Sequence, residues 1–216
     1  MRKLLYKEMR LSANPLSYWF ITFSAMTMIP RYPILVGSFF ICLGIFYTYQ
    51  QVRECDDITY TVMLPVSKQD VVTAKYLFVL LIELVAFVLC ALLTIIRMKT
   101  LGNAAPYVTN QLMNANAAYL GYLLAVFASF NGIFLAGFFK TAYKLGKPFI
   151  LFCVVGTIII LMGEVLHHIP SLESLNDPAN LSIPQVVILL IGIVMFKLCT
   201  WFSYQKAIKD FERLDL

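Results

Sequence analysis

Six runs of mostly apolar residues follow one another along this 216-residue chain, with short polar segments between them. A helix of roughly 20 apolar residues spans the ~30 Å hydrocarbon layer of a bilayer. Hydrophobic residues make up 60% of the chain and charged residues 13%, whereas soluble domains average roughly 45–50% and 25%. This excess predicts an all-α integral membrane protein, with a single transmembrane domain over residues 1–216 and no room for a folded soluble domain.

The apolar runs predict six transmembrane helices. Asn14 and Pro15 fit an N-cap and a first helical turn. A tight turn at residues 30–33, which holds two prolines, separates the first two spans. We expect the spans at residues 16–29, 34–49, 76–96, 117–139, 148–165 and 183–204.

Lysine and arginine are divided unevenly between the two ends of these spans. Thirteen of the seventeen fall on one side, three on the other, and Lys197 lies inside the last span. Because cytoplasmic loops carry an excess of basic residues, both termini are expected in the cytoplasm. Residues 1–13 mix apolar and basic residues at helical spacing, which predicts an amphipathic helix in the membrane interface. A tail attracted to anionic lipid is the alternative.

Several kinds of chemistry are disfavoured by the sequence. The net charge is +5, but the basic residues are scattered between apolar runs instead of forming one patch, so nucleic acid is not an expected partner. There is no GxxxxGK[ST] phosphate loop, so no cofactor is expected in this chain. Glu164, His167 and His168 form a weak candidate for a metal or catalytic site, as in an intramembrane hydrolase. We favour a polar cap at the outer end of the fifth span.

Two ionisable residues inside the predicted spans need an explanation. An ionisable residue near a helix centre costs about 2.5–3.5 kcal/mol, and Glu83 and Lys197 lie in the third and sixth spans. They could pair with each other, or Lys197 could extend its ammonium group to the interface. As an ion or proton relay they would instead indicate a stand-alone secondary transporter or channel. No repeat relates the two halves of the chain, as it often does in such transporters.

Small residues recur every fourth position in the fourth span. Such spacing lets helices approach closely. The predicted packing stripe comprises Gly121, Ala125 and Ser129, with Gly132 and Ala136 on a neighbouring stripe. Packing within the chain, a dimer seam and a pathway wall would all use this surface, and Asn131 beside it could hydrogen-bond across to another helix.

Residues 50–75 form the longest polar segment between spans. Ser67 and Asp70 fit an approximate capping box, and Pro65 prevents the helix from beginning earlier. A helix is therefore expected to begin at Lys68. The bend at residues 64–70 would present a mixed apolar and polar surface, although capping alone carries no functional information.

The same segment carries a resemblance to a known family. The segment resembles permeases of the type-2 exporter class of ATP-binding cassette (ABC) transporters, particularly those of a small bacterial family. The similarity lies in the turn that precedes the third span. The matching residues are Leu64, Pro65, Val66, Ser67 and Lys68, then Lys75, Tyr76 and Leu77. The basic start, the six spans and the missing ATPase motif extend the resemblance over essentially the whole chain.

The resemblance implies how the protein would work. Two permease chains, identical or different, would pair in a bacterial plasma membrane, and each would receive a separate cytoplasmic ATPase subunit that binds ATP and Mg²⁺. The expected cargo is an amphipathic or hydrophobic peptide, of the phenol-soluble-modulin or bacteriocin type, moved by alternating access. The implied ATPase-coupling residues are Asp57, Leu64, Pro65, Val66, Ser67, Lys68 and Asp70. A purely structural membrane subunit is a further alternative.

Overall fold

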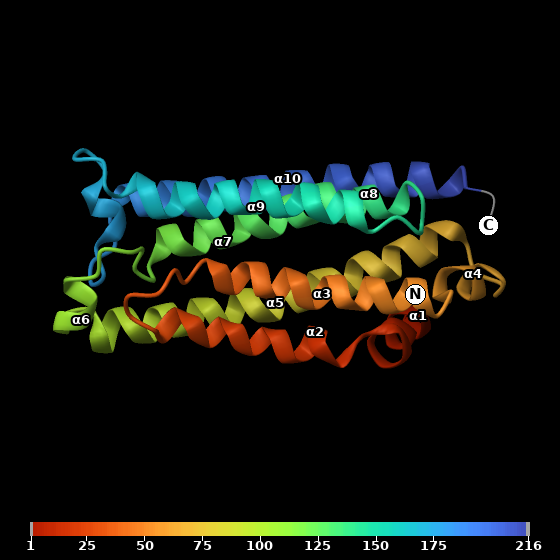
Figure 1. Ribbon diagram of the computed structural model, residues 1–216, viewed down its shortest axis with the longest axis horizontal. Coiled ribbons are helices and arrows are strands. Elements are labelled where there is room, and N and C mark those ends of the chain that lie inside the picture. Colours follow the sequence, from red (N-terminus) through yellow and green to blue (C-terminus); the bar gives the residue numbers. More distant parts are fainter. Residues whose placement is uncertain (1, 215–216) are drawn as a thin grey trace.

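The computed structural model describes residues 2–214, which form an elongated bundle of helices (Figure 1). The α-helices are α1 (Arg2–Lys7), α2 (Pro15–Trp19), α3 (Val36–Glu54), α4 (Asp57–Val62), α5 (Lys68–Leu101), α6 (Ala105–Val108), α7 (Ala117–Ser129), α8 (Ala136–Phe139), α9 (Gly146–Leu166) and α10 (Ile183–Glu212). The irregular helices are η1 (Glu8–Ser12), η2 (Phe20–Met28), η3 (Phe130–Leu135) and η4 (Glu173–Asn176). Because this range contains no strand, the all-α prediction is confirmed.

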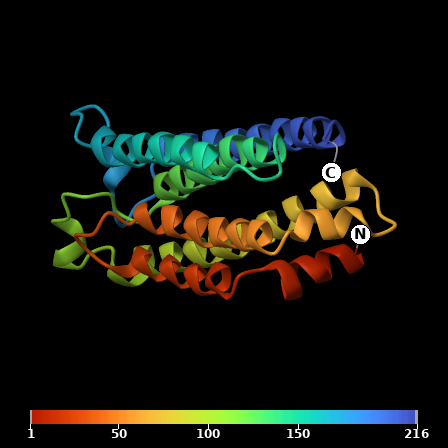
Figure 2. The same ribbon diagram turned by 45° about the vertical axis from the view of Figure 1, so that its right-hand side comes forward.

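Four of the described helices are long and apolar enough to cross a membrane, not the six that we predicted. They are Lys68–Leu101, Ala117–Phe139, Gly146–Leu166 and Ile183–Glu212. The first predicted span falls short because it divides between α2, which has only five residues, and the nine-residue 3-10 helix η2. Helix α3 has nineteen residues, but its last turn and a half, including Arg53 and Glu54, is polar. Both segments nevertheless run alongside the long helices (Figures 1 and 2).

Local signals set where several of these helices begin. The Asn14 side chain accepts a hydrogen bond from the Leu16 N–H at 2.9 Å, and Pro15 occupies the first turn, as the sequence indicated. In the turn at residues 30–33, Arg31 adopts a left-handed conformation with φ of 57°. Ser17 Oγ then donates to the Gly44 carbonyl at 2.6 Å, which holds α2 against α3.

Two helices extend further than the apolar runs predicted. Helix α10 continues to Glu212 instead of ending near residue 204, because Ala207 and Phe211 are fully buried against the bundle. Helix α5 covers residues 68–101 and includes the end of the predicted loop 50–75, which also contains α4. The predicted segment 1–13 forms α1 and η1, and α1 packs against α5. Residue 1 and the last two residues of the chain lie outside the described range.

Both ends of the described chain lie at the same end of the bundle (Figure 1). Helices α1 and α4 lie there with the end of α10, whereas α6 lies at the opposite end. An even number of passes along the bundle follows from this arrangement. The segments that carry most of the lysine and arginine residues, including residues 140–147, gather at the end with the two termini.

Helix α7 lies inside the bundle, and every residue in it except Ala125 is buried. Its closest neighbour is α10. A Cβ atom on Gly121 would lie 2.5 Å from the Ile188 carbonyl oxygen, and one on Gly192 would meet the backbone of Gly121. The predicted packing stripe is thus used at Gly121 for a contact within the chain. A groove of about 380 Å³ beside it is bordered by Gly121 and Ala125.

Other members of the stripe are less tightly packed. A Cβ atom on Gly132 would find only Cys199 Cβ, at 3.8 Å. Ser129 directs its hydroxyl to the Val126 carbonyl of its own helix at 2.7 Å, and Ala136 is buried. The stripe therefore contains one position where only hydrogen fits and another with room for a methyl group.

Replacing Gly121 with alanine is expected to destabilise the bundle, because the new methyl group must push the α10 backbone away. Overpacking of this kind costs about 1–3 kcal/mol. Gly132→Ala is the matched control and should be neutral or stabilising by up to about 1 kcal/mol, since alanine favours helix over glycine. Thermal unfolding of the two variants in detergent measures the difference, and equal melting temperatures would contradict the close approach.

Candidate functional site

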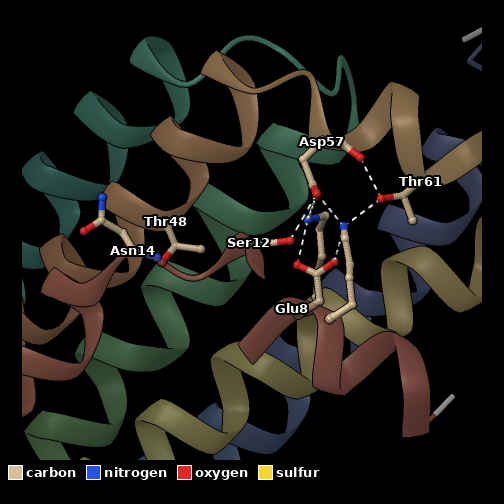
Figure 3. A network of polar contacts seen from close by, with 8 residues as sticks. Glu8, Ser12, Asn14, Thr48, Asp57 and Thr61 are labelled. Carbon is tan, nitrogen blue, oxygen red and sulfur yellow. Dashed lines mark hydrogen bonds and ion pairs between the residues drawn. The ribbon is translucent and has the colours of Figure 1, made fainter. Parts of the chain in front are cut away.

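A cluster of buried charges joins α1, η1, α4 and α5 (Figure 3). Lys75 Nζ lies 2.9 Å from Glu8 Oε2 and 3.0 Å from Asp57 Oδ2. The side chains of Lys75 and Glu8 are each 2% exposed, and that of Asp57 is 13% exposed. A lysine buried to this degree is tolerated when it is paired and hydrogen-bonded. We call these residues, with Lys7, the charge cluster.

Lys7 completes the charge balance of the cluster. Its ammonium group lies 3.1 Å from Glu8 Oε1, also contacts Asp57 Oδ1, and donates to Thr61 Oγ1 at 2.7 Å. Ser12 Oγ donates to Asp57 Oδ1 at 3.1 Å. Two ammonium groups thus face two carboxylates, and neither carboxylate is left without a partner.

The sequence around each residue explains how the cluster forms. Lys75 follows Val71 and Val72 on the buried side of α5, where i and i+4 positions share a face. Asp56 turns the chain between α3 and α4 in the left-handed conformation, with φ of 50°, which aspartate tolerates better than most residues. The Tyr143 hydroxyl donates to Asp56 Oδ1 at 2.6 Å, so the loop between α8 and α9 supports this turn.

The outward side of α4 and the bend after it expose apolar side chains. Tyr60 is 65% exposed, Met63 79% and Leu64 38%. They lie at the end of the bundle that holds both termini, beyond the apolar stretch of the long helices. We call these three residues the apolar knob. Exposed apolar residues that gather at one place commonly mark an interaction site.

The predicted start of α5 is formed. Ser67 Oγ accepts a hydrogen bond from the Asp70 N–H at 3.0 Å and donates to Asp70 Oδ2 at 2.7 Å. Lys68 Nζ donates to the Leu214 carbonyl at 2.5 Å and reaches the Glu212 carbonyl at 3.5 Å. An ammonium group is favourable at a helix C-terminus, so Lys68 ties the start of α5 to the end of α10. Whether these residues transmit movement stays a prediction.

The intramembrane residue Glu83 has a different partner from the one considered in the sequence. Its Oε2 atom accepts from Asn131 Nδ2 at 2.9 Å, and the same nitrogen lies 3.1 Å from Thr200 Oγ1. Lys197 is exposed on α10, and within the described part of the chain it is not ion-paired with Glu83. Asn131 does hydrogen-bond to two other helices, α5 and α10.

Glu164 and His167, which the sequence offered as weak metal candidates, hydrogen-bond to the backbone of the segment before α7. Glu164 Oε2 accepts from the Met113 N–H at 2.8 Å, and His167 Nε2 lies 3.1 Å from the Gln111 carbonyl. The His168 ring lies 4.3 Å from that of His167. Across residues 2–214, no group of three or more His, Cys, Asp and Glu residues could hold a metal ion. Glu164 and His167 therefore tie the end of α9 to the segment before α7.

Sequence reasoning missed most of the charge cluster. It treated Lys7 and Glu8 as part of a charged start and gave Asp57 and Lys75 significance only through the family resemblance. Their separations along the chain, 67 residues from Glu8 to Lys75 and 18 from Asp57 to Lys75, follow no local period. One feature could have indicated the cluster: Glu8 is the single acidic residue within the basic amphipathic segment 1–13.

Lys75→Ala is expected to destabilise the protein strongly, because it leaves two carboxylates around a single lysine. Breaking a buried ion pair by removing one partner costs about 3–5 kcal/mol. Arg53→Ala is the control: its side chain is 42% exposed and lies 3.9 Å from Glu54, and such pairs contribute about 0–1 kcal/mol. Unfolding in detergent should separate the two variants clearly, and a Lys75 variant as stable as the control would show that the cluster is not formed.

Stability should also depend on pH through Asp57. Burial raises the pKa of this carboxyl, but the ammonium groups of Lys75 and Lys7 outweigh it and hold the pKa below its ordinary value. A lowered pKa in the folded state stabilises the protein above the unfolded pKa of about 3.9, and this contribution is lost as the pH falls through the folded pKa. Melting temperatures from pH 7 to 3 should fall less steeply in Asp57→Asn than in the parent. Identical slopes would argue against the paired carboxylate.

The chain matches the family described as "ABC-2 family transporter protein" over residues 3–212. No curated protein and no solved structure matches it. The matched range includes all of the charge cluster, the apolar knob and every helix that could span a membrane. The protein therefore belongs to the ABC-2 family of membrane transporter proteins.

Proposed function

We propose that this chain is the membrane-spanning permease of an ATP-driven exporter and that a separate cytoplasmic ATPase docks on the apolar knob. The observation that carries the proposal is the exposed knob itself, held on a buried charge cluster at the end of the bundle with both termini. In the sequence, this is also the segment that resembles the ATPase contact of type-2 exporters. ATP and Mg²⁺ would be bound by the partner.

The geometry of the knob suits the transmission of force. Asp57 and Thr61 of α4 are bonded to Lys75 and Lys7, so α4 cannot be displaced from α1 and α5 without separating opposite charges. Helix α5 has 34 residues, which corresponds to about 51 Å at 1.5 Å per residue. A displacement of the knob would therefore be transmitted across the whole thickness of the membrane along α5.

The proposed topology has six crossings, with both termini in the cytoplasm. The α2–η2 segment and α3 would supply the two crossings beyond the four long apolar helices. They lie within the bundle at the level of those helices (Figure 2), and a crossing shorter than the bilayer can be accommodated by local thinning. The basic residues near the knob and the termini support a cytoplasmic location for that end.

The proposed cargo is an amphipathic or hydrophobic peptide that leaves a bacterial cell through a pair of permease chains. The resemblance to small exporters supports this cargo class. Aromatic rings of η2 and α3 offer an apolar surface: Phe23 and Phe40 stack at 4.7 Å between ring centroids, and Phe20 lies 5.2 Å from Phe23. The competing proposal is an ion-coupled transporter that uses Glu83 and Lys197 and needs no ATPase.

Met63→Asp combined with Leu64→Asp should abolish ATPase binding without unfolding the permease, because both side chains are exposed. The measurement is co-purification of the tagged chain in mild detergent, with the bound proteins identified by mass spectrometry and ATPase activity assayed. Val108→Asp, an exposed apolar residue at the opposite end, is the control and should retain the partner. An ATPase that binds the double variant as well as the parent would place the contact elsewhere.

The same purification tests the transporter class. A stoichiometric cytoplasmic ATPase with the parent chain supports the ABC mechanism. Transport of cargo by the purified chain alone in proteoliposomes, driven by an ion gradient and lost in Glu83→Gln, would overturn it.

The coupling role of the segment before α5 can be tested with a triple variant. Replacing Ser67, Lys68 and Asp70 together with alanine should uncouple ATP hydrolysis from transport while the permease still inserts.

A further inference from the structure

The surface between α5 and α10 contains an apolar groove with one unpaired cation. The groove has a volume of about 580 Å³, and its lining includes Leu77 and Leu80 of α5 and Leu198, Trp201 and Tyr204 of α10. Lys197 is the only charged residue in its lining. Within the described residues, Lys197 makes neither an ion pair nor a hydrogen bond, unlike Lys75 in the charge cluster.

The groove continues toward the middle of the membrane. A second cavity of about 220 Å³ shares Leu80 and Phe196 with it, extends to Phe87 and is also lined by Glu83, whose carboxylate is hydrogen-bonded to Asn131. From Thr73 at one end to Phe87 at the other, α5 rises about 21 Å at 1.5 Å per residue. Half of the hydrocarbon layer is about 15 Å thick, so the two cavities together are long enough for an acyl chain of one leaflet.

The polar groups of the groove lie where a lipid headgroup would sit. Thr73 Oγ1 and the Tyr204 hydroxyl are 2.9 Å apart at the end near the termini, and Trp201 is 59% exposed beside them. Tyrosine and tryptophan favour the headgroup level. Because these two hydroxyl groups bond to each other, the Lys197 ammonium is the group left to bind an anion, and its long stem can carry it toward the interface.

We propose that this groove binds an anionic phospholipid of the leaflet on the side of the termini, with one acyl chain along Leu77 and Leu80 and the phosphate drawn to Lys197. Charge complementarity selects the occupant, because a lone ammonium in an apolar groove facing the membrane finds its counter-ion among lipid headgroups. A basic residue near a membrane surface favours anionic over neutral lipid by about fivefold. The proposal is independent of whether an ATPase binds the knob.

The experiment is native mass spectrometry of the full chain in detergent, titrated with phosphatidylglycerol or phosphatidylcholine. Lys197 should make the parent bind phosphatidylglycerol about fivefold more tightly than it otherwise would, and Lys197→Gln should lose this fivefold share of the preference. Lys206→Gln is the control, since this lysine is exposed on the same helix but lies outside the groove. It should keep the preference.

A second variant tests the acyl chain separately. Leu77→Trp fills the groove while leaving the lysine in place, and it should weaken binding of both lipids. Retention of the phosphatidylglycerol preference in Lys197→Gln, or an equal loss in Lys206→Gln, would overturn the proposal. A disulfide between two Leu198→Cys chains in membranes would also overturn it, because it would place a second copy in the groove. This variant needs a background in which Cys55, Cys153 and Cys199 are replaced with serine.

Discussion

The buried ammonium group of Lys75 determines how one end of the molecule is built. An unpaired charge at this depth would cost several kcal/mol, so α5 can bury it only if carboxylates from elsewhere reach it. Glu8 and Asp57 do so from η1 and α4. The positions of the N-terminal segment, the loop helix and the longest helix are therefore interdependent, and the apolar knob acquires a fixed base instead of a flexible loop.

The middle of the bundle is held by a different principle. Hydrophobic burial does not drive helices together in lipid, so close backbone contact must supply attraction. Gly121 and Gly192 bring α7 and α10 into such contact, and Asn131 adds hydrogen bonds to Glu83 and Thr200.

At the far end, Arg97 is 1% exposed, donates to Asn114 at 2.8 Å and lies 4.5 Å above the Tyr107 ring. Buried polar contacts therefore stabilise both ends of the bundle, through Lys75 at one end and Arg97 at the other.

Local patterns predicted local structure well. Ser67 and Pro65 placed the start of α5 because a cap and a missing N–H act within a few residues. Only four helices are long and apolar enough to cross a membrane where six were predicted, because apolarity alone does not show that the first run is mostly a 3-10 helix or that α3 ends in polar residues. The charge cluster was not predictable, since Glu8 and Lys75 resemble ordinary surface charges until the fold brings them together. For Glu83, the sequence indicated the need for a partner, but only the fold selects Asn131.

The start of α5 is connected in two directions, and this bears on how movement would spread in the proposed mechanism. Lys75 ties α5 to η1 and α4, whereas Lys68, two turns earlier, ties it to the end of α10. The first connection is buried and joins opposite charges, whereas the second is partly exposed and ends on backbone carbonyl groups. Hydrogen bonds of the second kind are weaker and easier to exchange with water. A displacement of α4 would therefore keep η1 and α5 together and would break the Lys68 contact with the end of α10 before the charge cluster.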